Sequence, residues 1–262
     1  MIRSTLFLLF VTLFVSPVLA QTPQAPQTYT YLIYHKLAPG MTIQDALPVE
    51  REWRAINQAA VDEGKLIGWH MMVKQMSSNP NPTEYDYVTC IVSPEMGIKG
   101  ASPAAMAKIY GDSVQTRMAS LQKRDRQTAP VVKIEVWENL SPLFGAGFRP
   151  DKQLNVVVDF LKLRDAQTDW RPSVTALTRT GTDLTGQKQL AGWGLSALVV
   201  PNAAEKGYNF AQVRAATSLG ILARVADAKQ LENSRQLNRT FEVVRQEVFR
   251  FEEFTLRPSV SK

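Results

Sequence analysis

The sequence predicts an α+β protein made of two tandem βαββαβ units, each of about 110 residues. Two observations support this fold class. Four sequence landmarks occur twice in the same order, and the same succession of β-rich and helical segments accompanies them in both copies. The 262 residues, 45% of them hydrophobic, are enough for one or two domains and exclude a disordered chain.

The clearest landmark is a Gly-Trp pair that opens a β-rich run, Gly68-Trp69 in the first copy and Gly192-Trp193 in the second. The other matching segments are 52–54 with 169–171, 84–87 with 207–210, and 134–138 with 248–252. Because the order is conserved between the copies, we interpret the chain as an internal duplication.

The landmarks set the boundaries of the two repeats. We expect the first repeat at 28–140 and the second at 151–258, followed by a short tail at 259–262. Residues 141–150 are rich in proline and glycine, which is typical of a linker.

The first repeat opens with a β-rich, aromatic segment at 29–37, which predicts a strand. A helix is predicted next at 48–64, because a proline opens it, a glycine ends it and apolar residues recur near helical spacing. Two strands then follow at 67–75 and 85–92, on either side of a Ser-Asn-Pro-Asn-Pro connection.

A second helix is predicted at 102–122, with Pro103 in its first turn, and a last strand at 131–138. The second repeat has the same order of elements. Its strands are expected at 154–163, 191–200, 208–215 and 246–255, its helices near 169–184 and 231–244, and a short extra helical segment near 219–225.

The first 20 residues have the pattern of a secretory signal peptide. Arg3 supplies the positive charge, an apolar run of about ten residues follows, and small or apolar residues precede a cleavage point after Ala20. A transmembrane anchor needs about 20 apolar residues. We therefore expect cleavage, a secreted or periplasmic location, no membrane contact afterwards, and a flexible spacer at 21–27.

Two sequential βαββαβ units with a Gly-Trp strand in each resemble the dimeric α/β-barrel superfamily. This ferredoxin-like group includes antibiotic-biosynthesis-type monooxygenases and EthD-like and NIPSNAP-like proteins. The resemblance implies that two antiparallel sheets, each with strand order 4-1-3-2, face one another and close a barrel. It also implies an intramolecular barrel in a monomer, and oxygenase, isomerase or lyase chemistry without a cofactor. Some barrels of this superfamily degrade haem, so a haem ligand is the alternative, but neither His35 nor His70 lies in a recognisable haem motif.

Alternation along the strands divides side chains between the barrel interior and the helices. We assign the small residues of the third strand of each repeat to the helix side, namely Val88, Cys90, Val92, Ala211, Val213 and Ala215. Cys90 is then expected to be a buried packing residue, since no basic residue lies beside it in the sequence. A single cysteine excludes an intramolecular disulfide.

The same assignment places one set of aromatic and polar side chains inside the barrel as ligand-binding candidates. These are Tyr31, Tyr85, Tyr87, Trp137, Asp159, Phe210, Gln212 and Arg214. The implied strand order puts His35 beside the strand of Glu135, and we predict both as catalytic residues of a His–carboxylate general base. Asp159 and Arg214 are predicted to orient a substrate carboxylate or enolate. The alternative is that these pairs only bridge two packed sheets.

Several functional classes are disfavoured. The two histidines, His35 and His70, lack clustered carboxylates in the sequence, so we predict no metal site. His70 follows the first Gly-Trp pair, and its counterpart in the second repeat is Gly194. The net charge of +6 is spread thinly and is not interleaved with aromatic residues, so nucleic-acid binding is not expected.

Two functions follow from these expectations. The first is a secreted or periplasmic protein that binds a small apolar or aromatic molecule in the barrel cleft and acts on it. The alternative is a non-enzymatic structural or assembly module with a packed barrel interior. A cavity of about 300 Å³ or more would favour the first function, and a filled interior would favour the second.

Overall fold

The computed structural model describes residues 27–79, 81, 84–141, 147–202, 206–222, 235 and 237–257. The predicted signal peptide, the spacer up to residue 26 and the tail at 259–262 lie outside these residues. Within the described part of the chain, no helix combines the length and the apolar character needed to cross a bilayer.

The first repeat follows the predicted order of elements. It contains β1 (Thr28–His35), α1 (Ile43–Asp62), β2 (Gly68–Ser77), β3 (Tyr87–Ser93), α2 (Pro103–Tyr110), the 3-10 turn η1 (Gly111–Ser113), α3 (Val114–Thr128) and β4 (Val131–Asn139). The single helix expected at 102–122 is instead two helices. Gly111 ends α2 with a φ of +59°, a backbone conformation that glycine adopts without a Cβ clash.

α1 begins at Ile43, earlier than the predicted start at residue 48. Thr42 and Asp45 form a capping box, in which the Asp45 carboxylate accepts a hydrogen bond of 2.8 Å from the backbone N–H of Thr42. This Thr-x-x-Asp signal is stronger than the proline signal at Pro48, which lies inside the helix.

The second repeat has the same order with a longer last strand. It contains β5 (Asn155–Leu163), α4 (Arg171–Gly186), β6 (Gly192–Val200), β7 (Phe210–Ala216), α5 (Leu219–Leu222) and β8 (Phe241–Phe254). The helix predicted at 231–244 is wrong in its last four residues, because β8 already pairs with β5 from Phe241 onward.

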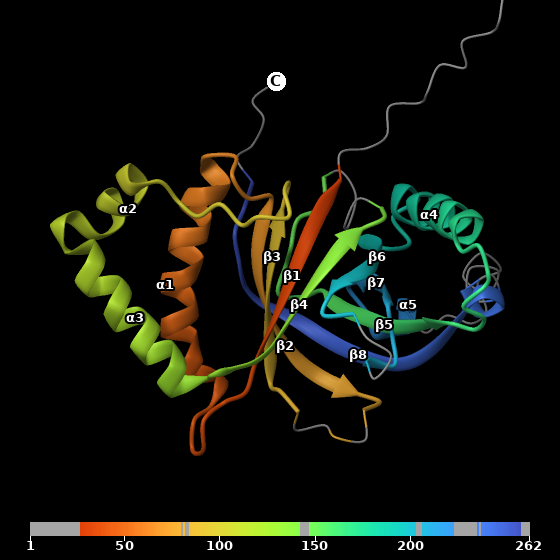
Figure 1. The fold of residues 1–262 in the computed structure, drawn as a ribbon, viewed down its shortest axis with the longest axis horizontal. Helices are drawn as coiled ribbons and strands as arrows, with labels where there is room; N and C mark the ends of the chain where they lie inside the picture. The colour runs from red at the N-terminus through yellow and green to blue at the C-terminus, as the bar shows by residue number, and fades with distance from the viewer. Residues whose placement is uncertain are drawn as a thin grey trace, which may run out of the picture.

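The eight strands close into one antiparallel barrel in the order β1-β3-β2-β8-β5-β7-β6-β4. Each repeat therefore has the strand order 4-1-3-2, and the repeats join where β2 pairs with β8 and β4 with β6. The predicted fold class is confirmed. α1, α2 and α3 lie on one side of the barrel and α4 on the other (Figure 1).

The repeated Gly-Trp pair has the same structural role in both repeats. Trp69 packs beneath α1 with Ala46 and Leu47. Trp193 lies beneath α4, where a Cβ atom on Gly181 would stand only 2.1 Å from Cδ2 of the indole ring. Gly181 thus lets α4 lie directly on the buried tryptophan.

The predicted face assignment is wrong for the third strand of each repeat. The small residues of β3 and β7, including Cys90, pack inside the barrel rather than under the helices. The interior of an eight-stranded barrel is just wide enough for side chains to fill it. Small residues on β3 and β7 leave room there for large residues from other strands, among them Tyr34, Trp137 and Phe160.

Candidate functional site

A cavity of about 50 Å³ lies inside the barrel. Every strand contributes to its lining, which consists of Thr30, Leu32, Tyr34, His70, Met72, Val88, Cys90, Trp137, Val158, Phe160, Ser196, Ala211, Val213 and Phe249. Most of these side chains are apolar. The volume is well below the roughly 300 Å³ at which ligand pockets for larger molecules begin.

His70 lines this cavity and carries a hydrogen-bonding atom without a partner among the described residues. It projects from β2 opposite Cys90 of β3, is 8% exposed, and packs edge-to-face against Phe251 with ring centres 5.5 Å apart. Its Nδ1 atom is buried and has no hydrogen-bond partner among the described residues. Burial, aided by the charge of Arg257, lowers the pKa of His70 to about 4, so the imidazole is neutral at physiological pH.

The buried carboxylate of Glu135, on β4, lies next to the cavity wall. Tyr34 and Tyr208 each donate a hydrogen bond of 2.6 Å to it, and Lys206 forms an ion pair with it. The ammonium group of Lys133 lies 3.5 Å away. Burial alone would raise the pKa of Glu135, but these cations and phenols hold it below its usual value.

A second buried carboxylate, Glu247 on β8, has similar surroundings. Tyr85 donates a hydrogen bond to it, and Nη2 of Arg245 lies 3.0 Å from it. Tyr85 and Tyr208 occupy equivalent places in the two repeats, and each donates to the carboxylate of the other repeat. Burial and the neighbouring carboxylates raise the pKa of both phenols well above the usual value, so both stay protonated donors.

Three of the predicted site residues, Tyr85, Trp137 and Glu135, contribute to the barrel interior. The others lie on the outer faces of the strands: His35, Tyr31, Tyr87, Asp159, Phe210, Gln212 and Arg214. This difference has one cause. Shifting the assignment of a strand by one residue moves its whole side-chain set to the opposite face.

The structure separates the predicted catalytic pair. Glu135 bonds Tyr34, so the next residue along β1, His35, points away to the opposite face. The predicted contact between Asp159 and Arg214 is present at 2.8 Å, but on the outer side of the barrel. Gln246 also donates to Asp159 at 2.6 Å, which is the arrangement of a structural ion pair.

Sequence reasoning missed Tyr34 and Lys206 as members of the interior network and did not place His70 inside the barrel. Tyr34 is adjacent to the predicted His35, so assigning the other set of alternate side chains of β1 to the interior would have identified it. Lys206 directly precedes the landmark that contains Tyr208, but no pattern in the sequence distinguishes it from other surface lysines.

No family model matches the chain, and a search of curated proteins gives no significant match. Seventy-nine chains of solved structures are similar to it. One, a candidate monooxygenase from Fusobacterium nucleatum, has a TM-score of 0.55 at 6% identity and covers 87% of this chain and 93% of its own. Another, a candidate monooxygenase from Lactobacillus acidophilus, has a TM-score of 0.50 at 8% identity, covering 88% and 97%. These likenesses show the fold alone.

The prediction that the fold needs no cofactor is corrected by a third match. A haem-binding protein from Thermus thermophilus has a TM-score of 0.47 at 11% identity and covers 86% of this chain and 92% of its own. That protein binds haem, and a similarity of this size assigns no haem to the present chain.

The cavity inside this barrel does not fit a haem. Its volume of about 50 Å³ is several times smaller than the pockets that enclose large ligands, and fourteen side chains from all strands surround it. The shared feature is thus the architecture of the barrel. The chain has the fold of the dimeric α/β-barrel superfamily, with both ferredoxin-like repeats contained in one polypeptide.

Proposed function

We propose that the barrel interior binds a small apolar molecule that carries one hydrogen-bonding group. The observation that supports this most directly is the cavity at His70, whose buried Nδ1 atom has no partner among the described residues. An unpaired buried polar atom costs about 1–3 kcal/mol. A ligand hydroxyl would remove that cost with either neutral tautomer of the imidazole, because a hydroxyl both donates and accepts hydrogen bonds.

The volume of the cavity limits the ligand to a few heavy atoms. At about 50 Å³ it is smaller than the roughly 150 Å³ apolar cavity that admits benzene. Met72 is the adaptable part of the wall, since an unbranched thioether side chain can change its rotamer. An aromatic ring would therefore enter only when Met72 moves aside.

Binding is better supported than proton-transfer catalysis. His70 is the one lining side chain of the described cavity with a basic nitrogen. A general base works best when its pKa is close to the operating pH, and the pKa of His70 is about 4. The group therefore suits hydrogen bonding to a ligand more than removal of a proton from it.

The proposal is tested by NMR of protein with ¹³C-labelled methionine methyl groups. Xenon and 1-propanol should both shift the Met72 methyl signal, whereas that of Met76, on the same strand but 51% exposed, should stay in place. His70→Leu should weaken 1-propanol binding about fivefold, the loss of one hydrogen bond, and leave the xenon response intact. If neither probe moves the Met72 signal, the interior is a packed core and the structural-module alternative holds.

We also propose that the protein acts in a secreted or periplasmic location, because residues 1–20 have the pattern of a signal peptide. Mass spectrometry of the exported protein should give a mature chain that begins at Gln21. A full-length chain that starts at Met1 and stays with the cytoplasmic fraction would contradict this.

A further inference from the structure

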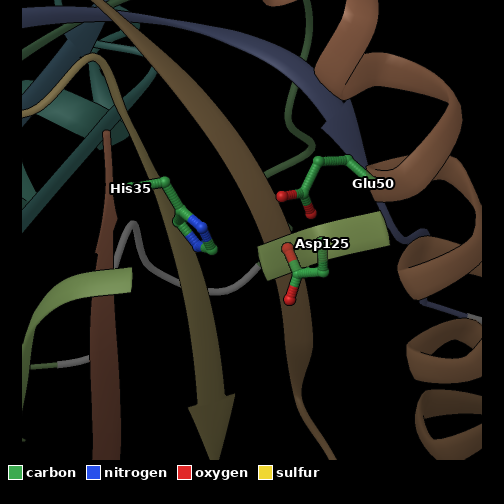
Figure 2. A group of neighbouring side chains, drawn as sticks. All are labelled: His35, Glu50 and Asp125. Atoms are coloured by element: carbon green, nitrogen blue, oxygen red, sulfur yellow. The ribbon is translucent and has the colours of Figure 1, made fainter. Parts of the chain in front are cut away.

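Three potential metal-ligating side chains meet on the helix-facing side of the first repeat, away from the barrel cavity. They are His35 of β1, Glu50 of α1 and Asp125 of α3. One ligand atom from each lies within 4.8 Å of the others. Figure 2 shows the imidazole and the two carboxyl groups directed toward the same space. We infer that this cluster is a binding site for one divalent transition-metal cation, with Zn²⁺ as its best match.

The ligand atoms come from three separate elements and are held in place by neighbouring groups. Tyr87 donates a hydrogen bond of 2.7 Å to Glu50, and its ring stacks on the imidazole of His35 at 4.6 Å. Nδ1 of His35 lies 3.2 Å from the carbonyl oxygen of Ala129. Such outer contacts are the usual means by which proteins orient metal ligands and choose the imidazole tautomer.

Without a cation, the two carboxyl groups of the cluster have no positively charged side chain as a partner among the described residues. In the described part of the chain, no ion pair joins Glu50 or Asp125 to a basic side chain. Trp53 donates to Asp125, but Oδ1 of Asp125 is buried without a hydrogen-bond partner. Burial and the charge of Asp125 raise the pKa of Glu50 to about 8, and burial raises the pKa of Asp125. Burial and the neighbouring carboxylate of Asp125 thus keep Glu50 protonated at neutral pH when no cation is bound.

A divalent cation supplies the missing positive charge and displaces the proton of Glu50. Two carboxylates, one neutral imidazole and one M²⁺ ion have no net charge, which suits a site where Glu50 is 1% and His35 4% exposed. Burial lowers the pKa of His35 to about 4, so its ring keeps a lone pair for the metal at neutral pH. Asp125 is only partly buried and leaves a route of entry from solvent.

The donor set selects the metal. Nitrogen with carboxylate oxygen suits Zn²⁺ and related transition metals, whereas Mg²⁺ prefers oxygen ligands and retains its waters. The imidazole has two present contacts, Thr89 Oγ1 at 3.0 Å from Nε2 and the Ala129 carbonyl at Nδ1. The cation replaces one of them, and the other then fixes the ring.

The site is tested on the full chain after removal of metal with a chelator. Titration with Zn²⁺ and elemental analysis after gel filtration should give one equivalent per chain, and saturating Zn²⁺ should raise Tm. Glu50→Gln, which keeps an acceptor for Tyr87, and Asp125→Asn should each weaken binding at least about tenfold. Asp62→Asn is the matched control, because Asp62 is exposed at the end of α1 and should bind within about twofold of wild type.

Two results would overturn the inference. One is a wild-type chain that binds no stoichiometric Zn²⁺, and the other is unchanged affinity in both ligand variants. Circular dichroism of each variant shows whether it is folded. If Glu50→Gln does not fold, Asp125→Asn decides the matter, since Asp125 is only partly buried and the amide keeps the shape of the carboxyl group.

Discussion

Replacing Gly181 with alanine should destabilise the protein by about 3 kcal/mol. In the middle of a helix, this change normally stabilises by up to about 1 kcal/mol. Here the new Cβ atom would stand 2.1 Å from Cδ2 and 2.4 Å from Cε3 of Trp193. The indole is 3% exposed and lies between α4 and the sheet, so either the ring or the helix must shift, at the cost typical of overpacking.

The same helix offers the matched control. Gly186 ends α4, and a Cβ atom there would meet nothing within 4 Å. Gly186→Ala should therefore leave the free energy of unfolding unchanged or slightly higher. Urea denaturation of both variants measures the difference, and equal midpoints for Gly181→Ala and Gly186→Ala would show that α4 does not rest on Trp193 as described.

Replacing Glu135 with glutamine should cost about 3 kcal/mol at neutral pH. Glu135 is fully buried and accepts hydrogen bonds from two phenols while pairing with Lys206. The amide keeps the shape but removes the charge and turns one oxygen into a donor. It therefore leaves a tyrosine hydroxyl and an ammonium group without their acceptor. Removing one partner of a buried pair costs more free energy than replacing both, because the other partner stays buried and uncompensated.

This loss should depend on pH in a defined direction. The folded pKa of Glu135 lies below its usual value of 4.5, so its ionised form stabilises the protein above that pH. The stabilisation disappears as the pH falls through the folded pKa, and the gap between wild type and Glu135→Gln should close there. Glu138→Gln, on the same strand but outside the barrel, should change stability by less than about 0.5 kcal/mol at any pH.

The fold could be predicted from the sequence because each landmark occurs in both repeats, so that the elements of one repeat could be checked against those of the other. Each Gly-Trp pair supports the assignment of the other, and the positions of Tyr85 and Tyr208 agree between the repeats. The order of the strands in the sheet came from the family resemblance. Helix ends were less certain. At α1, for example, the capping box of Thr42 and Asp45 mattered more than Pro48.

The candidate site was harder to predict. Which alternate side chains of a strand face the interior depends on packing against residues that are distant in the sequence. Nothing local distinguishes the face of β1 that carries Tyr34 from the face that carries His35, since both are aromatic and both are buried. The face that points inward is determined by the volume of side chains that the barrel interior can hold. Only the whole set of interior side chains, from all eight strands, shows that small residues of β3 and β7 must point inward.

The contrast between His70 and Gly194 has a consequence for how such a barrel can specialise. Both face the interior, because their strand partners Cys90 and Val213 line the cavity. A barrel assembled from two identical subunits would have to place a histidine at both positions or at neither. Joining the repeats in one chain lifts that restriction. The interior can then carry an imidazole from the first repeat and only a hydrogen atom at the equivalent position of the second, so its two halves differ in chemistry.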